Sequence, residues 1–488
     1  MIIKKSWRIG SLLLLLNLFI ILNSLFLLLG PHYATDTWIE EMVGHDPRTP
    51  LSSGRPVWAV ALYLLKRIGF PPIAHRTFFT FLFMVTAASC AVLLTMAFVH
   101  DRKHSALQML LINGSCLLGV HNVFILEWYL FPEAMGMYAL CLAGSVGAAI
   151  FAAHAHRPLE WLAAFALLFI GINSYQAGLG IFASCAIFLI AAYPSRCSLL
   201  RIAGILLLAG SVSVLNPLLT NLSITVGMIP PSSRGIDLSA LSGNITYVAK
   251  QVSELWSSGY HLMPAPLLIF TLLLAVAALL YTCVHSRDLR SRGTILIAPL
   301  IGLCAVFAPH LISSEHWMSA RSIAGVFIPC AGAFALLSLC LQMKSLQLLL
   351  GSLICTLVLT QSACMQQITL EHLKLNMADI QYARQIGTVL RERETQTGIL
   401  IRRIAMCEDA DPQGHSIMVR RRWMNVNESA FGPDWSKIAI LNQVNWGDWV
   451  LTDMPEHVMA SFSGRNWDYF NPDEQIVVEN DTAYIVLY

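Results

Sequence analysis

Three carboxylates and an arginine gather in the stretch that follows the first apolar segment. Asp36, Glu40 and Glu41 come first, and the triplet Gly54-Arg55-Pro56 follows shortly afterwards. If residues 36–43 are helical, Asp36 and Glu40 are neighbours on one face. One carboxylate of such a pair can take a proton from a hydroxyl group while the second orients it, and Arg55 can hold a phosphate through paired hydrogen bonds. The alternative is a solvated acidic helix start in which Asp36 serves only as a cap.

Further polar residues stand in apolar surroundings, where charged groups are costly and therefore informative. Glu127 and Glu133 flank an aromatic segment, and two acids in an aromatic belt can line a substrate cavity. Tyr175 and Gln176 offer neutral hydrogen-bonding groups at a turn, and Arg321 closes a polar cluster that begins at residue 314. The alternative for the aromatic segment is an ordinary set of interface anchors.

The C-terminal region is rich in tryptophan beside asparagine and aspartate. Trp446, Trp449 and Trp467 are candidates for contact with a sugar, because sugar rings stack on aromatic faces while their hydroxyls hydrogen-bond at the rim. A domain of this size also needs aromatic residues for its own core, so the core reading stays open for each of them.

The composition requires a lipid environment. Hydrophobic residues make up 56% of the chain and charged residues 12%, with a mean hydropathy of +0.62, whereas soluble domains carry about 25% charged residues. No long basic run indicates nucleic acid as a partner. No Cys/His group has metal-ligand spacing, so we expect neither a metal nor a cofactor.

Apolar runs long enough to cross a bilayer, about 17–25 residues, recur along the chain. About eleven are expected, and the short pair 160–172 and 179–193 could instead be a re-entrant hairpin. The expected segments are 9–29, 77–99, 106–121, 134–153, 160–172, 179–193, 201–220, 263–284, 294–312, 323–342 and 346–363.

The basic residues predict the orientation of these segments. Cytoplasmic loops carry the excess of lysine and arginine, and alternate connections here do so: Arg102, Lys103, Arg157, Arg196, Arg201, Arg287, Arg290, Arg292 and Lys344. We therefore expect a cytoplasmic N-terminus and, with an odd number of crossings, a C-terminal region on the outer side. The predicted fold class is an all-α polytopic membrane domain over 1–364, with a large first outer loop at 30–76, followed by a small extracytoplasmic α+β domain over 365–488. Strand-like runs within that domain are 399–401, 438–441 and 483–487.

Several of these features together resemble one family. They are the first span, Tyr33-Ala34-Thr35-Asp36, Gly54-Arg55-Pro56 at the start of an amphipathic helix, Asn173-Ser174-Tyr175-Gln176-Ala177, and the outer tail. The chain resembles the serotype-converting O-antigen glucosyltransferases of the Gtr type from enteric bacteria and their phages. The likeness covers the whole chain in architecture and short motifs in sequence.

The resemblance implies a GT-C membrane glycosyltransferase of the bacterial inner membrane. Its donor would be undecaprenyl phosphate glucose, and its acceptor a sugar of the lipid-linked O-antigen on the periplasmic side. The catalytic base would be the carboxylate of Asp36, Glu40 or Glu41, and Arg55 or Arg321 would neutralise the phosphate that leaves. The family pattern often has two adjacent acids early in the loop, whereas this chain has its adjacent pair at Glu40-Glu41, so the identity of the base stays open. The tail would set acceptor specificity.

Two other functions fit part of the pattern. A flippase or transporter for a lipid-linked sugar would use the same aromatic and charged rim, but internal repeats are absent from the sequence. An O-antigen polymerase would carry its large loop late in the chain, whereas here the large regions are the first loop and the tail.

Overall fold

The computed structural model describes residues 2–100, 104–193, 195, 197–230, 237, 239–286, 288–409 and 419–487. Of the basic residues that predict the orientation, Arg102, Lys103, Arg196 and Arg287 lie outside these ranges. The chain divides into two compact units. The first comprises Met1–Pro31 and His45–Gln367, and the second comprises His32–Gly44 and Ile368–Tyr488.

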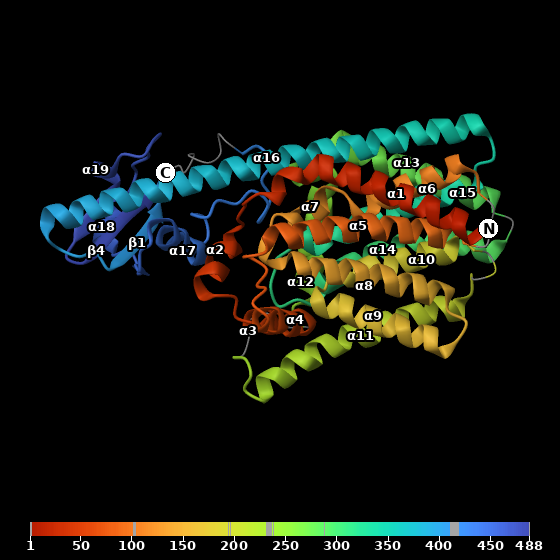
Figure 1. Cartoon of the computed structure of the whole chain (residues 1–488), viewed down its shortest axis with the longest axis horizontal. Helices are drawn as coiled ribbons and strands as arrows, with labels where there is room; N and C mark the ends of the chain where they lie inside the picture. Colours follow the sequence, from red (N-terminus) through yellow and green to blue (C-terminus); the bar gives the residue numbers. More distant parts are fainter. Residues whose placement is uncertain are drawn as a thin grey trace. The chain divides into compact units, whose positions relative to one another are not determined.

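The first unit is helical, and its longer helices run side by side (Figure 1). Its elements are α1 (Ile2–Leu25), η1 (Phe26–Leu29), α3 (Arg48–Ser52), α4 (Pro56–Arg67), α5 (Arg76–Phe98), α6 (Ala106–Val120), α7 (Val123–Tyr129), η2 (Pro132–Ala134), α8 (Met135–His154), α9 (Pro158–Ser174), α10 (Gly178–Ala191), α11 (Leu199–Thr225), α12 (Leu241–Ser258), η4 (Gly259–His261), α13 (Ala265–His285), α14 (Leu289–Leu311), η5 (Ala320–Phe327), α15 (Ile328–Cys340) and the first part of α16 (Lys344–Thr397).

The helices agree with the apolar segments that the sequence predicts. Among the described residues, eight helices are long and apolar enough to cross a membrane, or nine if α6 and α7, which meet at a bend of 58°, form one span. The shorter apolar helices α9 and α10 coincide with the remaining two predicted segments. The chain is therefore a membrane protein, and the count of eleven crossings stays a prediction.

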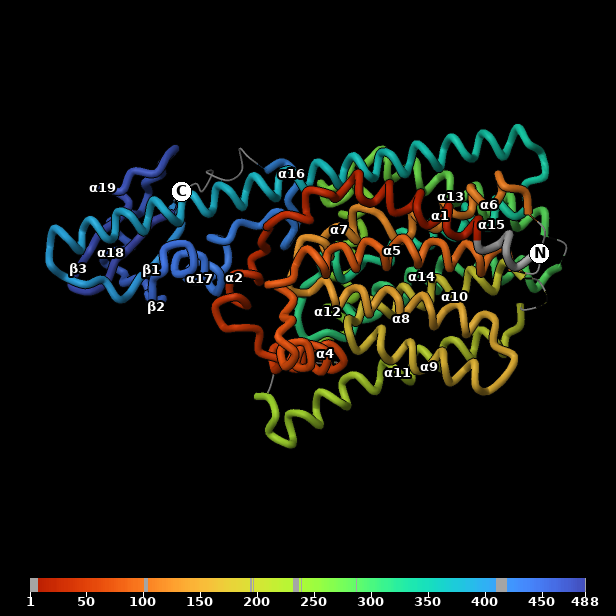
Figure 2. The backbone as a smooth tube through the Cα atoms, viewed as in Figure 1, coloured from red at the N-terminus to blue at the C-terminus, as the bar shows by residue number. Residues whose placement is uncertain are grey.

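Helix α10 lies in the interior of the first unit. Every residue of it except Leu179 is buried, and it packs against α8, α14 and α15. A Cβ on Gly180 would come within 2.8 Å of the Val306 Cα, so α10 and α14 approach each other closely. A helix that is apolar on all sides is typical of such a buried position. Figure 2 shows α8 and α9 as neighbouring tubes beside it, and these two helices also pack together.

Helix α16 is shared by both units because of its length. Its 54 residues extend for about 81 Å at ~1.5 Å per residue, whereas the hydrocarbon core of a bilayer is only about 30 Å thick. The predicted last span, 346–363, and the polar residues that follow it are thus parts of one continuous helix. No turn-forming residue interrupts it between them.

The second unit combines the polar part of α16 with a small mixed sheet. Its other elements are α2 (Thr35–Val43), β1 (Arg403–Glu408), α17 (Asp434–Asn445), β2 (Val450–Leu451), α18 (Glu456–Phe462), α19 (Pro472–Gln475), β3 (Ile476–Glu479) and β4 (Thr482–Leu487). The strand order is β2-β1-β4-β3, with β1 parallel to β2 and β4, and β3 antiparallel to β4.

The strand predictions have mixed outcomes. The run 483–487 is confirmed, because it lies in β4. The run 399–401 precedes β1 and forms no strand. The run 438–441 was predicted as a strand, which is wrong: it lies in the middle of α17. All four of its residues are buried, and a short apolar run that is buried all round has no periodicity that separates helix from strand.

Candidate functional site

The Gly54-Arg55 turn and the 173–176 turn meet in the first unit. The Gln176 side-chain amide donates to the Gly54 carbonyl at 2.9 Å and to the Ser53 carbonyl at 3.2 Å. Asn216, from the middle of α11, donates to the Gly54 carbonyl at 2.7 Å and to the Asn173 Oδ1 at 3.1 Å. Two motifs that lie about 120 residues apart in sequence therefore form one hydrogen-bonded corner.

Gly54 is required at this corner by both its conformation and its surroundings. Its φ is +71°, and a Cβ would lie 2.9 Å from the Gln176 Nε2 and 3.1 Å from the Asn216 Oδ1. Residues with a side chain are disfavoured in this left-handed region. The turn fixes the backbone immediately before Arg55, which precedes Pro56 at the start of α4.

Arg55 lies against an aromatic wall. Its guanidinium carbon is 5.0 Å from the centre of the Tyr175 ring. The Tyr175 ring meets the Tyr138 ring edge to face at 5.3 Å, and Tyr138 stacks on Trp128 at 4.8 Å with an interplanar angle of 10°. Cation–π contact of this kind holds a guanidinium in place without consuming its hydrogen-bond donors.

Arg321 lies in the same region and pairs with Glu127. The Arg321 Nε is 3.3 Å from the Glu127 Oε1, with the side chains 10% and 0% exposed. The Arg321 backbone N–H donates to the Glu127 Oε2 at 2.7 Å, and the Trp128 indole N–H donates to the Arg321 carbonyl at 2.8 Å. The guanidinium carbon also lies 4.2 Å from the Phe131 ring centre and 5.0 Å from that of Trp317.

Arg55, Arg321 and Glu127 lie close enough to two tyrosines to interact with them electrostatically. Tyr138 and Tyr175 each interact electrostatically with Arg55, Arg321 and Glu127. Arg55 and Arg321 bring two guanidinium groups, and Glu127 one carboxylate, to these buried aromatic groups. Electrostatic attraction is stronger in such surroundings than in water. This cation–aromatic site, defined by Arg55, Arg321, Glu127, Tyr138 and Tyr175, therefore suits an anionic group such as a phosphate.

The sequence identified most of this site, but not all of it. Glu133, the other predicted acid of the aromatic segment, is buried in η2. Sequence reasoning missed Tyr138 and Asn216. An asparagine in the middle of an apolar helix is a signal that could have found Asn216, whereas Tyr138 lies inside α8 with nothing in the sequence to mark it.

The three candidate acids lie on α2, in the second unit. The helix forms where the sequence predicts it, so Asp36 and Glu40 are four residues apart on one face. Asp36 and Glu40 are half-buried and Glu41 is exposed. Asp36 is not the helix cap: Ala34 holds that position, and its N–H donates to the Thr37 hydroxyl at 2.9 Å.

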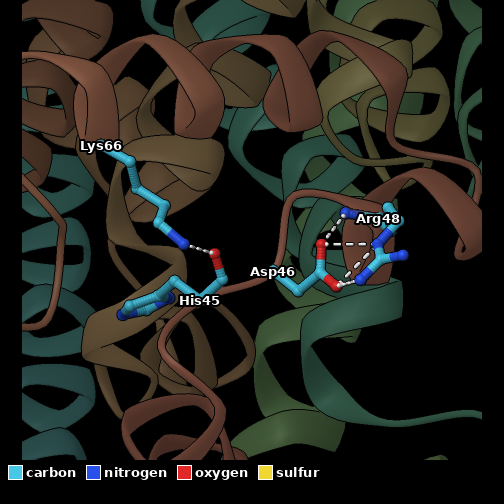
Figure 3. A network of polar contacts seen from close by, with 4 residues as sticks. All are labelled: His45, Asp46, Arg48 and Lys66. Atoms are coloured by element: carbon cyan, nitrogen blue, oxygen red, sulfur yellow. Dashed lines mark hydrogen bonds and ion pairs between the residues drawn. The ribbon is translucent and has the colours of Figure 1, made fainter.

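A polar network follows α2 in the chain (Figure 3). The Lys66 ammonium donates to the His45 carbonyl at 2.7 Å, which joins this segment to the end of α4. The Asp46 carboxylate accepts three hydrogen bonds from Arg48, one from the backbone N–H and two from the Nε–H, and these hold the pKa of Asp46 below its usual value. Burial, with a smaller contribution from Lys66, lowers the pKa of His45 to about 4. His45 is therefore neutral at physiological pH.

The three candidate tryptophans of the tail have different surroundings. Trp449 is buried in the core of the second unit with Ile438 and Phe431. Trp467 is half-buried, and its indole N–H donates to Glu474 at 3.0 Å. Trp446 is 95% exposed. Only Trp446 of these three presents an open aromatic face for stacking.

The Trp446 turn is held in an uncommon conformation. The φ of Trp446 is +54°, which is rare for a bulky residue. Residues in such sparsely populated backbone conformations cluster at functional sites. The Asn442 side chain fixes the turn, because it accepts from the Trp449 N–H at 3.0 Å and donates to the Trp449 carbonyl at 2.9 Å.

No group of three or more His, Cys, Asp or Glu side chains among the described residues is placed to hold a metal ion. Ionisable residues buried within an apolar helical bundle are typical of a functional site in a membrane protein. The family model described as Glucosyl transferase GtrII matches residues 25–330, a range that includes Arg55, Tyr175 and Arg321. The chain belongs to this glucosyl transferase family and is a membrane glycosyltransferase. Neither the curated proteins nor the solved structures contain a match to it.

Proposed function

We propose that this protein transfers a glucosyl residue from undecaprenyl phosphate glucose to a sugar of the lipid-linked O-antigen, on the periplasmic face of the bacterial inner membrane. The observation that carries the donor assignment is the cation–aromatic site. Each of two guanidinium groups lies over an aromatic ring there, Arg55 over Tyr175 and Arg321 over Phe131. Guanidinium groups match the geometry of phosphate oxygens.

The donor phosphate is held by Arg55 and Arg321 in this proposal. Glu127 orients Arg321 through the ion pair and the backbone hydrogen bond. The Arg55 side chain is aligned by the Gly54 corner and the Tyr175 ring. Fixed cations that face a leaving phosphate stabilise the charge that develops as its bond breaks.

The acid helix α2 supplies the base. A carboxylate among Asp36, Glu40 and Glu41 takes the proton of the acceptor hydroxyl, whose oxygen attacks the anomeric carbon of glucose. The bond from that carbon to the phosphate oxygen breaks, and its electron pair leaves with the polyprenyl phosphate. The reaction is a single displacement that inverts the anomeric centre.

The acceptor sugar stacks on Trp446 in the same proposal. An exposed indole offers an apolar face to a sugar ring, and a turn that is already ordered loses little conformational entropy on binding. The Asn442 contacts hold the backbone of this turn. Trp449 and Trp467 support the tail fold instead.

The test is glycan analysis of lipopolysaccharide from a bacterium that supplies polyprenyl phosphate glucose, with and without this protein. We expect one added hexose per O-antigen repeat. The addition should be lost in Arg55→Ala and in at least one of Asp36→Asn, Glu40→Gln and Glu41→Gln, which identifies the base. Glu392→Gln, at an exposed position of α16, is the matched control. An unchanged repeat with altered chain length or export would overturn the proposal in favour of a polymerase or a flippase.

A further inference from the structure

The segment that carries the candidate acids folds as part of the C-terminal unit. Trp38 of α2 is 4% exposed and lies in the core formed with Ile386, Leu390 and Phe431. Tyr33, just before the helix, stacks on Trp38 with ring centres 4.3 Å apart and an interplanar angle of 14°. A short helix such as α2 is marginal on its own, so its position depends on these contacts with the tail.

Asn376 of α16 fixes the backbone that leads into α2. The Tyr33 N–H donates to the Asn376 Oδ1 at 2.7 Å, and the Asn376 Nδ2 donates to the Tyr33 carbonyl at 2.8 Å. The Asn376 side chain is buried. Both backbone groups of one residue are thus paired with a single carboxamide, as in a strand pairing, across 343 positions of the chain.

Gln443 of α17 makes a second contact. Its side-chain amide donates to the Trp38 carbonyl within α2. The preceding residue on the same helix, Asn442, fixes the Trp446 turn. Helix α17 therefore connects the acid helix to the exposed Trp446 within one folded unit.

The burial of Trp38 determines which way the side chains of Asp36 and Glu40 point, because all three residues lie on one helix. Asp36 and Glu40 are each two positions from Trp38, which is about 200° around a helix of 3.6 residues per turn. With Trp38 in the core, both carboxylates are directed to the opposite side of α2. A rotation or shift of α2 would move both of them together.

We infer that Asn376 and Gln443 are positioning residues for the α2 carboxylates, so that the C-terminal unit sets the geometry of the base as well as binding the acceptor. This inference rests on the proposed function for its catalytic part. A misplacement of about 1 Å at a reacting group can lower a rate by about a hundredfold. Loss of either contact should therefore reduce kcat without weakening the binding of donor or acceptor.

The test compares Asn376→Leu and Gln443→Leu with Gln385→Leu in the full-length protein. Gln385 is an exposed amide on α16, so its replacement makes the same chemical change without touching α2. Two quantities are measured: the kinetics of glucosyl transfer, and the hydrogen exchange of the backbone amides of residues 33–43.

We expect kcat to fall at least tenfold in Asn376→Leu and in Gln443→Leu, with KM within about twofold of the wild-type value. Amide exchange in 33–43 should become faster in both variants, and Gln385→Leu should match wild type in both measurements. If Asn376→Leu does not fold, Gln443→Leu alone decides the question.

Three outcomes separate the inference from the proposed function. Unchanged kcat in a folded variant whose amides do exchange faster would overturn the positioning role. Unchanged exchange would overturn the claim that the tail contacts hold α2. A wild-type protein that transfers no glucose at all would instead overturn the proposed function, while the exchange measurement would still test how α2 is held.

Discussion

Replacing Glu127 by glutamine removes the negative charge that faces Arg321 while preserving the shape of the side chain. The amide oxygen can still accept the Arg321 backbone N–H, which now donates to the Glu127 Oε2 at 2.7 Å. The guanidinium, however, keeps its charge in a place where its side chain is only 10% exposed. Removing one partner of a buried ion pair costs about 3–5 kcal/mol, because the other charge stays buried without compensation.

We expect a loss near the lower end of that range, about 3 kcal/mol, because the stacking on Phe131 and Trp317 remains. Arg321→Met should be destabilising by a similar amount, since it leaves the Glu127 carboxylate without its cation. The double variant Glu127→Gln/Arg321→Met buries neither charge, and uncharged replacements of buried pairs are often nearly neutral. Its free energy of unfolding should therefore lie within about 1 kcal/mol of wild type, which gives a coupling energy well above the usual additivity error of about 0.5 kcal/mol.

The measurement is denaturant unfolding of the purified protein in detergent micelles, with Glu392→Gln as the exposed control. Glucosyl transfer is measured on the same samples. The double variant should regain stability but not transfer, because Arg321 contacts the donor phosphate in the proposed mechanism. Equal stability of Glu127→Gln and the control would refute the reasoning about the buried pair. Recovery of transfer in the double variant would refute the role of Arg321.

Three other predictions concern the first loop and the tail. Gly54→Ala should destabilise the protein more than Gly69→Ala. Both glycines have a positive φ, which costs about 1–2 kcal/mol for alanine, but a Cβ has no atom within 4 Å at Gly69 and meets the Gln176 amide at Gly54. Equal losses of stability in unfolding measurements would contradict the close packing of the corner. The pKa of His45 is 6.5 in the unfolded chain and about 4 in the folded protein. Between these two pH values the unfolded state binds more protons than the folded state. The free energy of unfolding should therefore fall by up to about 3 kcal/mol as the pH drops from 6.5 to 4. The φ of His45 is +54°, which asparagine tolerates. His45→Asn should therefore fold without this fall in stability in a pH series of thermal midpoints. Trp446→Ala should keep the free energy of unfolding within about 0.5 kcal/mol of wild type yet reduce glucosyl transfer. Trp449→Ala should lower the free energy of unfolding by about 3–5 kcal/mol. A normal KM for the acceptor in Trp446→Ala would exclude stacking of the sugar on this residue.

The sequence alone determined the features that depend on local patterns. Length and apolarity define the membrane helices, because a bilayer of fixed thickness requires a fixed number of apolar residues. The spacing of Asp36 and Glu40 places them on one helical face for the same kind of local reason. The predicted alternation of the spans also assigns Arg55, Glu127, Tyr175 and Arg321 to one side of the membrane, and in the structure these residues belong to one connected group of contacts.

Tertiary structure decided which of these residues touch and which only stabilise the fold. Nothing local pairs Arg321 with Glu127, which lies 194 positions away, and nothing local separates the buried Trp449 from the exposed Trp446. The largest difference concerns α2: sequence order places it in the first loop, but its Trp38 is buried with the tail. Burial of an aromatic side chain depends on which distant surface is available to cover it, and that surface exists only after α16 and α17 have folded together.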